Sequence, residues 1–536
     1  MRLKKDCTCL PCLKVDSCLD DVFYAEKLLS HSEERTMSWC CLLPGLSTGL
    51  VFGAVLALAW WWRQSRPRNL PPGPSGHFLF GNLKDFGLRP EINFMKFAKQ
   101  YGPVFKLYFA NRLMVVLNGY DVIKATLVGE ADAFAGRPSL YINNTVTGVN
   151  GLSQLPYGGR RLKEQRKFAF SCLREIGRVG KIELEEKIVQ EMEVLSSTFD
   201  KMIGETFEPY PVIFKGVSNI ICNICFGSRF EYDDERFLTL LQTFDQEKNP
   251  TKKAALVQFV SWLRFLPSYR KLLNKIYDTC GKFIDVIQGI VDEHRQHFRP
   301  ENEVYDVIDA FLLEQHKARE SGDHSSSFTD DQLHWFLGDL YIAGSETTTR
   351  TLVWSLALLV AHPEVYKRLQ AEINDVIGHA RNPKMSDRHN MPYMEATILE
   401  ILRFSTVAPL AVPHATTRDV VINGYNIPKD TFVFINLWSI HYAANTWADP
   451  DKFDPTHFLD AEGQVCRPEA FMPFSGGARV CPGESLAKMD TFMFLTSLMQ
   501  RFSFSLPPGA DPLKAVHSDI GTGLPPPFKL RAERRK

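Results

Sequence analysis

The sequence has no net charge, because its 62 basic residues are balanced by 62 acidic ones over 536 positions. A neutral chain lacks a bulk attraction for nucleic acid, so any charged docking surface must be local. Regular cysteine spacing is also missing: of 12 cysteines, six crowd the first 41 residues and six are scattered over the rest. This distribution excludes a secreted disulfide framework and favours reduced thiols in a cytosolic compartment.

Beyond residue 75 the sequence has neither a flexible linker nor an internal repeat. This absence predicts one globular unit over residues 75–536, and 45% hydrophobic residues are ample for its core. Cys222 and Cys225 have the C-x-x-C spacing of redox sites. They lie in the apolar run 217–226, however, which favours packed core thiols.

Residues 1–36 carry six basic and seven acidic side chains without helical periodicity. We interpret them as a polar leader, which initiation at Met37 would leave out of the native protein. No charge occurs from Cys40 to Trp62, and these 23 residues can cross about 30 Å of hydrocarbon as a helix. The sequence therefore predicts a membrane anchor over residues 37–62.

Three arginines, Arg63, Arg66 and Arg68, directly follow the predicted anchor. Basic residues beside a membrane span lie on its cytosolic side, so the downstream chain is expected to face the cytosol. The segment Leu70-Pro71-Pro72-Gly73-Pro74 cannot be helical and ends the anchor. We therefore predict a basic, proline-rich hinge over residues 63–74.

A single cysteine near the carboxyl end stands in a glycine-rich loop, Phe474-Ser475-Gly476-Gly477-Ala478-Arg479-Val480-Cys481-Pro482-Gly483. A thiolate among glycines, with backbone N–H groups free to point at its sulfur, is suited to bind an iron atom. The apolar run 486–499 predicts a following helix, whose N-terminal dipole favours a negative sulfur. The side chain of Arg479 is placed to bind an anion on the same ligand.

The pattern F-x-x-G-x-R-x-C-x-G, formed by Phe474, Gly477, Arg479, Cys481 and Gly483, resembles the haem-binding loop of the cytochrome P-450 monooxygenases. The resemblance implies haem b, with Cys481 as the axial iron ligand and cofactor contacts from the other four residues.

Two alternatives are open for this cysteine. It is either a structural residue in a glycine-rich turn, or a zinc ligand together with Cys466 and His457. Neither alternative accounts for the phenylalanine and arginine positions of the motif.

A second motif, Ala343-Gly344-Ser345-Glu346-Thr347-Thr348, lies within a long helical pattern that Thr329 opens as N-cap. Small residues at 343 and 344 leave room beside the helix for a flat ligand and O2. The hydroxyl of Thr347 can bond backward to a carbonyl and open the helix locally. An acid followed by an alcohol can relay protons, so we expect Glu346 and Thr347 to be catalytic. The motif resembles the oxygen-activation motif of the same family.

Local resemblance to the family also implies that Arg137, Arg166, His414 and Arg479 bind the haem propionates. The tryptophan that the family carries four residues before Arg166 is replaced by Leu162, which has no donor.

Residues 160–181 hold eight basic and two acidic side chains and are predicted to open as a helix. In the family the corresponding helix docks acidic patches of the reductase. We therefore expect Lys163 and Lys167 to contact the electron donor; the alternative is an ordinary solvated helix face.

Glu400 and Arg403 have the E-x-x-R spacing that places two charges on one face of a helix. Together with His457 they resemble the structural triad of the family, in which the third partner is often arginine. Strands are predicted at 104–109, 113–117, 420–422 and 431–436, with helices elsewhere. The expected fold is mainly α with small β-sheets, a cytochrome P-450 fold with one N-terminal transmembrane helix.

Residues 218–230 and 487–506 resemble family 2, the animal microsomal group, and several runs resemble its subfamily U long-chain fatty-acid hydroxylases. The resemblance implies a haem-thiolate catalytic domain over residues 75–536. Its expected reaction inserts one oxygen atom of O2 into a lipophilic small molecule: a fatty acid, a steroid or a xenobiotic.

The expected electron source is NADPH through NADPH-cytochrome P-450 reductase, with cytochrome b5 as a second candidate donor. The expected location is the endoplasmic reticulum membrane, spanned once, with the catalytic domain on the cytosolic side. Two alternatives stay open: a haem-thiolate isomerase of lipid peroxides and a non-catalytic haem sensor. The Glu346–Thr347 pair argues against the isomerase.

Overall fold

The computed structural model describes residue 53 and residues 68–77, 80–110, 112–176, 181–243, 251–512, 523 and 525–535. The chain divides into two compact units, residues 1–68 and 69–536. The predicted leader and, apart from Gly53, the predicted anchor lie outside the described residues. Among the described residues, no helix is both long and apolar enough to cross a membrane.

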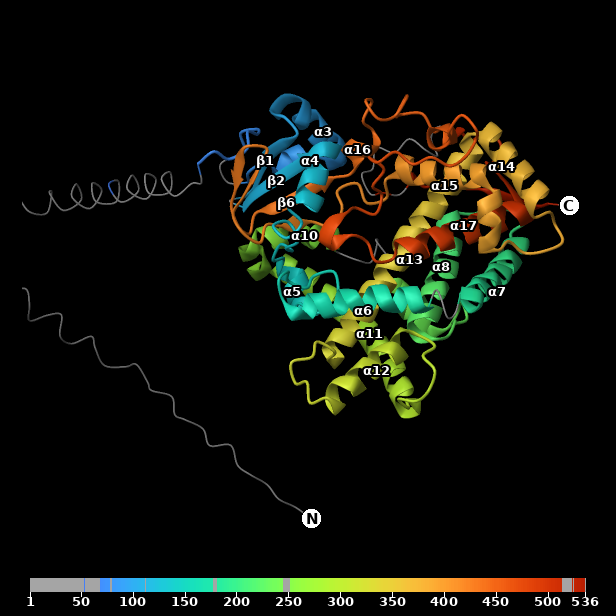
Figure 1. Ribbon diagram of the computed structural model, residues 1–536, viewed down its shortest axis with the longest axis horizontal. Coiled ribbons are helices and arrows are strands. Elements are labelled where there is room, and N and C mark those ends of the chain that lie inside the picture. Colours follow the sequence, from blue (N-terminus) through green and yellow to red (C-terminus); the bar gives the residue numbers. More distant parts are fainter. Residues whose placement is uncertain are drawn as a thin grey trace, which may run out of the picture. The chain divides into compact units, whose positions relative to one another are not determined.

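The second unit is mainly α-helical, as the sequence predicts (Figure 1). Its α-helices are α2 (Leu83–Phe86), α3 (Pro90–Tyr101), α4 (Tyr120–Lys124), α5 (Tyr141–Thr147), α6 (Arg160–Ile176), α7 (Lys181–Asp200), α8 (Pro209–Phe226), α9 (Glu235–Gln242), α10 (Thr251–Phe259), α11 (Pro267–His297), α12 (Val307–Glu320), α13 (Asp330–Ala361), α14 (Pro363–Val376), α15 (Pro392–Ser405), α16 (Trp438–His441) and α17 (Glu484–Arg501). A π-helix, η1 (Ala125–Gly129), follows α4, and short 3-10 helices are η2 (Ser261–Phe265), η3 (Met385–Asn390), η4 (Pro455–Phe458) and η5 (Gly477–Arg479).

The strands are β1 (Val104–Phe109), β2 (Arg112–Asn118), β3 (His414–Ala415), β4 (Val420–Ile422), β5 (Tyr425–Ile427), β6 (Phe432–Asn436), β7 (Phe502–Ser505) and β8 (Arg531–Arg534). In the largest sheet of the described residues the order is β1-β2-β6-β3. Strands β1 and β2 form the predicted antiparallel hairpin, while β2 and β6 run parallel, with Val116 opposite Phe434. The parallel pairing joins segments far apart in the sequence, and the sheet lies beside α3 and α4 (Figure 1). All four predicted strands are confirmed to within a residue at their ends.

Helix α13 passes through the main core, where it packs against α8, α15 and α17. A Cβ atom placed on Gly344 would come within 2.6 Å of Ile221 Cδ1, so the close crossing of α13 and α8 requires a very small residue. Cys222 and Cys225 of α8 are buried, free thiols whose pKa values burial raises well above the ordinary range. They are packed core thiols, as the apolar surroundings indicated.

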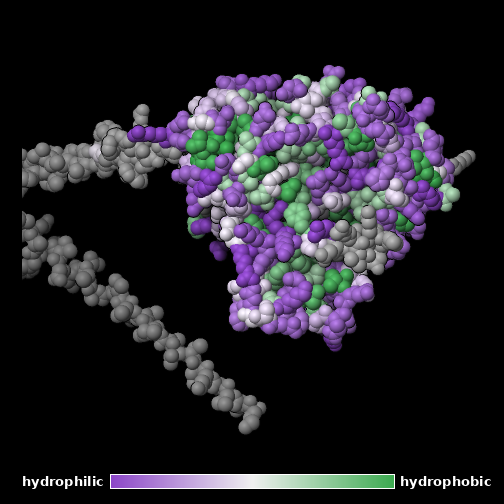
Figure 2. All heavy atoms as spheres, viewed as in Figure 1, coloured by the Kyte–Doolittle hydropathy of each residue, from purple (hydrophilic) through white to green (hydrophobic). Residues whose placement is uncertain are grey.

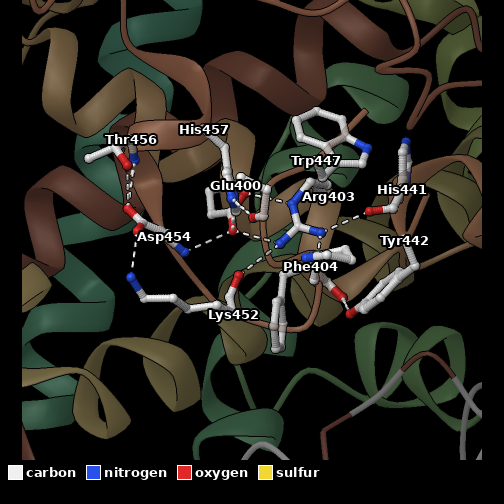
Figure 3. Close-up of polar contacts among 12 residues, drawn as sticks. Glu400, Arg403, Phe404, His441, Tyr442, Trp447, Lys452, Asp454, Thr456 and His457 are labelled. Atoms are coloured by element: carbon white, nitrogen blue, oxygen red, sulfur yellow. Dashed lines mark hydrogen bonds and ion pairs between the residues drawn. The ribbon is translucent and has the colours of Figure 1, made fainter. Parts of the chain in front are cut away.

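A buried ion pair holds α15 to the segment before the cysteine loop (Figure 3). Both carboxylate oxygens of Glu400 accept hydrogen bonds of 2.7 Å from the guanidinium of Arg403, and both side chains are fully buried. The same guanidinium donates to the carbonyls of His441 and Pro450, each at 2.8 Å. Because every donor is used, the burial of this charge is compensated.

The third predicted partner of the pair, His457, lies with Nδ1 3.2 Å from Glu400 Oε1. This contact raises the pKa of His457, so the folded state favours the charged ring. The predicted triad is therefore confirmed, with histidine in the place where relatives often carry arginine. Figure 2 shows that hydrophilic residues cover most of one face of this unit, interrupted by hydrophobic patches.

Candidate active site

A cavity of about 340 Å³ lies between α8, α13, α17 and the cysteine loop. It brings together most of the residues that the motifs single out: Arg137, Arg166, Thr347, His414, Phe474, Arg479, Cys481 and Gly483. Glu346 and Gly477 do not line this cavity. Segments separated by more than 300 residues thus meet at one site, which the local motifs alone could not show.

Cys481 sits just before α17, in a loop closed by a hydrogen bond of 3.2 Å from its own N–H to the carbonyl of Phe474. Burial raises the pKa of the Cys481 thiol, while the N–H of Gly483 and the charge of Arg166 favour the thiolate. A half-buried thiol at a helix start, with a backbone donor on its sulfur, needs only a cation to become a stable thiolate ligand.

Glycine is required at position 477 by the path of the loop. Its φ angle is 69°, in the left-handed region, and an added Cβ would overlap the carbonyl oxygen of Leu127 in η1. Gly477 therefore lets the cysteine loop approach η1, and in the described structure its contact is with the protein backbone. The cofactor contact expected for Gly477 stays a prediction.

Three arginines line one side of the cavity: Arg479, which is buried, and Arg137 and Arg166, which are half-buried. They are here called the cationic cluster. Their hydrogen bonds go to backbone carbonyls rather than to carboxylates. Arg137 donates to Pro413 at 2.8 Å, Arg166 to Val480 at 2.9 Å and Arg479 to Ala135 at 2.8 Å.

The cationic cluster is electrostatically unfavourable as it stands. Burial, together with the other two arginines, lowers the pKa of Arg137 to about 9. Burial and Arg166 lower the pKa of Arg479 to about 10. The Nη1 atom of Arg479 is buried and has no hydrogen-bond partner. An anionic ligand in the cavity would relieve the repulsion and complete these hydrogen bonds.

The carboxylate whose charge acts on Arg137 is that of Asp339 on α13, and this carboxylate already accepts hydrogen bonds from other groups. It accepts bonds of 2.6 and 2.8 Å from the N–H groups of Leu152 and Ser153, and 2.9 Å from the Ser153 hydroxyl. Asp339 therefore ties the loop before α6 to α13. It was not identified from the sequence, although an acid inside the apolar run 333–342 was a visible signal.

His414 lies on β3 with Nδ1 2.6 Å from the carbonyl of Phe134. Burial and Arg137 lower the pKa of its ring to about 3, so the ring is neutral and its Nδ1–H donates to that carbonyl. The Nε2 atom is then an acceptor. An anion entering the cavity would favour the charged ring, whose Nε2–H would donate to it.

On α13, the exposed residues Ala343 and Thr347 line the cavity. The Thr347 hydroxyl donates backward to the Ala343 carbonyl at 2.7 Å, as predicted. The local opening of the helix that we expected from this bond is wrong, because α13 is α-helical from Asp330 to Ala361. A hydroxyl bond of this kind adds a second donor to a carbonyl without breaking the helix.

Glu346 points elsewhere: its carboxylate forms an ion pair with Arg350, one turn later on α13. Both charges act on the pKa of Tyr210 in α8, which places the pair on the α8 side of the helix. A relay between Glu346 and Thr347 would therefore need an intervening water or a rotation of the glutamate side chain.

The predicted basic helix is present as α6, and Lys163 and Lys167 are exposed on it. Leu162 is buried and does not line the cavity, whereas Arg166, one turn later, does. The departure from the family at position 162 thus leaves the arginine contact with the cavity in place.

The zinc alternative for Cys481 does not fit the geometry. His457 uses both ring nitrogens, on Glu400 and on the carbonyl of Ala448, and Cys466 is exposed. Within the described part of the chain, the only group of three or more potential ligand side chains close enough to share a metal ion is His294, Asp306 and Asp309, away from this cavity.

Comparison with known proteins finds similarity over most of the chain. Residues 71–531 match the family model described as Cytochrome P450. The chain is 37% identical over 503 residues to cytochrome P450 2U1 of Mus musculus, covering 89% of this chain and 93% of that protein. It is 39% identical over 480 residues to cytochrome P450 2D6 of Homo sapiens, covering 88% of this chain and 95% of that protein.

The Gly477→Ala variant should lose most of its bound haem, because the new Cβ would push the cysteine loop away from η1. Gly509→Ala is the matched control: its φ is 79°, but a Cβ there meets nothing within 4 Å. The control should show only the strain of a left-handed alanine, about 1–2 kcal/mol. Haem content per polypeptide decides the matter, and equal content in the two variants would contradict the role of the close contact.

Proposed function

Because the chain belongs to the cytochrome P450 family of haem-thiolate monooxygenases, we propose that it hydroxylates lipophilic small molecules, with NADPH as the source of electrons through a reductase. The chain is an oxidoreductase, and its family binds haem through a cysteine thiolate. The observation that carries the proposal is that a half-buried thiol, a cluster of unneutralised arginines and a cavity-facing threonine line one and the same cavity.

The residues around the cavity fit haem. No carboxylate forms an ion pair with the arginines of the cationic cluster among the described residues, and the Nη1 group of Arg479 is a buried donor without an acceptor. The propionates of haem b are anions suited to both. Cys481 would hold the iron, and Phe474 and Gly483 line the cavity beside it. When bound, haem supplies iron that takes up electrons and binds and activates O2, and P450s are the standard example of a thiolate that favours O–O cleavage.

Thr347 is proposed to hold and pass protons at the cavity. At rest the hydroxyl donates to the Ala343 carbonyl, and its oxygen can accept a hydrogen bond from the cavity side. Rotation of the hydroxyl then lets it donate a proton toward the cavity. Ala343 and Gly344 have no side-chain bulk beyond Cβ, which leaves space for O2 next to this hydroxyl. Glu346 is proposed to supply a new proton to the Thr347 hydroxyl after the glutamate side chain has left its ion pair with Arg350.

The substrate class follows from the character of the cavity wall. Leu173, Ile221, Ile224, Val407 and Leu437 give it a largely apolar lining. Such a wall favours fatty acids, steroids or drug-like molecules over charged metabolites, because it offers those ligands burial without hydrogen-bond partners.

Docking of the electron donor is proposed on the exposed basic face of α6, through Lys163 and Lys167. NADPH-cytochrome P-450 reductase is the expected donor, with cytochrome b5 as a second. Large exposed apolar side chains at Trp262, Phe265 and Leu266, up to 73% exposed, support contact with membrane lipids. We propose the endoplasmic reticulum membrane as the location, with this unit on its cytosolic side.

The test of the function is turnover by the purified full chain with reductase on a panel of fatty acids, steroids and drug-like molecules. Oxygenated product that depends on NADPH and O2 is expected for at least one class. Rearrangement of a lipid peroxide without NADPH would instead support the isomerase. Haem binding without any product from the panel would favour the sensor.

The Thr347→Val variant should uncouple NADPH consumption from product, because valine keeps the shape but not the hydroxyl. Product per NADPH should fall by up to about 10²-fold, the lower end of what a general acid contributes. The matched control is Thr349→Val, since Thr349 makes the same 2.7 Å bond to the Ser345 carbonyl but is buried away from the cavity. Equal coupling in both variants would refute a role for the Thr347 hydroxyl.

A further inference from the structure

A histidine and two aspartates meet where helix α11 ends and helix α12 begins, away from the cavity of the cysteine loop. His294 lies in the last turn of α11, Asp306 is the N-cap of α12, and Asp309 lies in the first turn of α12. One potential ligand atom of each residue lies within 4.8 Å of the other two. The two helices pack against each other in the lower part of the view in Figure 1. These three residues are here called the α11–α12 cluster.

The hydrogen bonds of His294 leave one ring nitrogen facing a carboxylate. Its Nδ1 atom lies 2.8 Å from the carbonyl of Ile290, and because a carbonyl only accepts, this nitrogen carries a proton. The Nε2 atom lies 3.0 Å from Oδ2 of Asp306. In the neutral ring Nε2 is also an acceptor, and two acceptors at this distance repel each other. A cation must therefore bind both atoms, and it is either a proton or a metal ion.

The two aspartates carry more negative charge than their surroundings neutralise. Asp306 is 2% exposed, and its Oδ1 accepts from the N–H of Asp309 at 2.9 Å, which leaves Oδ2 for a cation. The Oδ2 atom of Asp309 accepts from the N–H of Tyr305 at 3.3 Å, which leaves Oδ1. In the described part of the chain, His294 is the only side chain that forms an ion pair with either aspartate. One imidazole cannot neutralise two carboxylates, so a divalent cation would be favoured here.

A cavity of about 540 Å³ adjoins the cluster. His294 and Asp309 line it, as do the exposed acids Glu293 and Glu303. Most of the lining residues are exposed, so ions from the solvent can reach the cluster. Acidic side chains around a cavity raise the local concentration of cations. A metal ion held by the cluster would keep one coordination position for water on the cavity side.

We propose that the α11–α12 cluster binds one Zn²⁺ ion, with Nε2 of His294, Oδ2 of Asp306 and a carboxylate oxygen of Asp309 as ligands. Imidazole and carboxylate are common zinc ligands, and in a tetrahedral site their donor atoms lie about 3.4 Å apart. Rotations of the side chains that move these atoms by about 1 Å produce that spacing. The imidazole disfavours Ca²⁺ and Mg²⁺, which prefer oxygen ligands.

The Nδ1–H bond to the carbonyl of Ile290 supports the assignment, because zinc-bound histidines usually donate their other ring N–H in this way. The bound ion would tie the end of α11 to the start of α12. The site is independent of the proposed monooxygenase function, since none of its residues lines the cavity of the cysteine loop.

A proton competes with zinc for the cluster. Burial disfavours the charged ring of His294, but the hydrogen bond with Asp306 outweighs burial and raises the pKa of His294 to about 9. Zinc binding therefore releases this proton, and a solution of about pH 8 limits the competition.

The test is the titration of the purified, haem-loaded full chain with Zn²⁺ in a calorimeter at about pH 8. His294→Gln and Asp309→Asn should each weaken zinc binding at least about tenfold, because loss of even an outer-shell partner of a ligand costs about 10–100-fold. The matched control is His297→Gln. His297 lines the same cavity and its Nδ1 lies 3.0 Å from the carbonyl of Glu293, but it does not belong to the cluster. Cysteines elsewhere bind zinc equally in all variants, so the differences between variants isolate the cluster.

A second readout is the stability of the folded chain, because the unfolded chain lacks the assembled site. At a free zinc concentration a hundredfold above Kd, the unfolding equilibrium constant should fall about 100-fold in wild type and in His297→Gln. It should change much less in His294→Gln and Asp309→Asn. Each variant is compared with itself without zinc, so the lost ion pair of His294 does not enter. The absorption of bound haem shows that each variant is folded.

Equal zinc binding by wild type, His294→Gln and Asp309→Asn would overturn the site and leave a proton as the cation of the cluster. Equal losses in His294→Gln and His297→Gln would place the ion on the histidines of the cavity and would overturn the ligand set as well. If His294→Gln does not fold, Asp309→Asn decides alone, since asparagine can still accept from the N–H of Tyr305. Turnover enters none of these outcomes, so the failure of the monooxygenase function and the failure of the zinc site are distinguishable.

Discussion

Repulsion among the three arginines of the cationic cluster is the constraint on which the site depends. Arg479 lies more than 300 residues beyond Arg137 and Arg166 in the chain. The three are tied together through backbone carbonyls: Arg166 donates to Val480 beside Arg479, Arg479 donates to Ala135 near Arg137, and Arg137 donates to Pro413. These bonds fasten the loops around the cavity while leaving the positive charges unneutralised. The unneutralised charges lower the stability of the folded chain, and an anionic cofactor bound in the cavity would neutralise them.

A fourth arginine, Arg403, shows how the protein buries a guanidinium group whose role is structural. Arg403 has a fully buried carboxylate partner in Glu400 and carbonyl acceptors for its remaining donors. Both sites enclose guanidinium groups, but only Arg403 has both a carboxylate partner and an acceptor for every donor. The unsatisfied site is the proposed haem site, and the satisfied one holds α15 to the segment that leads to the cysteine loop.

Much of this arrangement was predictable from the sequence. Polar motifs with fixed spacing identified the cysteine loop, the α13 motif and the Glu400–Arg403 pair, and runs of apolar and β-favouring residues located four strands. The relation of Glu346 to Thr347 was less well predicted, because consecutive residues on an α-helix point about 100° apart. The helix turns Thr347 to the cavity and Glu346 to Arg350.

Other parts of the site depend on tertiary packing and were not readable from local patterns. The need for glycine at 477 arises from Leu127, which lies in a different segment of the chain. Asp339 and Asp490 looked like interruptions of apolar helices, and only the assembled cavity shows that both face the same space. A buried acid in an apolar helix run is the general signal that would have flagged them.

The central claim is that Cys481 binds iron as a thiolate, and the absorption spectrum of the reduced carbon monoxide complex tests it most directly. Wild type should show a Soret band shifted to long wavelength, because an anionic sulfur opposite carbon monoxide donates electron density to the iron. The Cys481→Ser variant should lose that shift, since a neutral alcohol is a poor substitute for a thiolate. Retention of the long-wavelength band in Cys481→Ser would show that another residue is the ligand and would contradict the account.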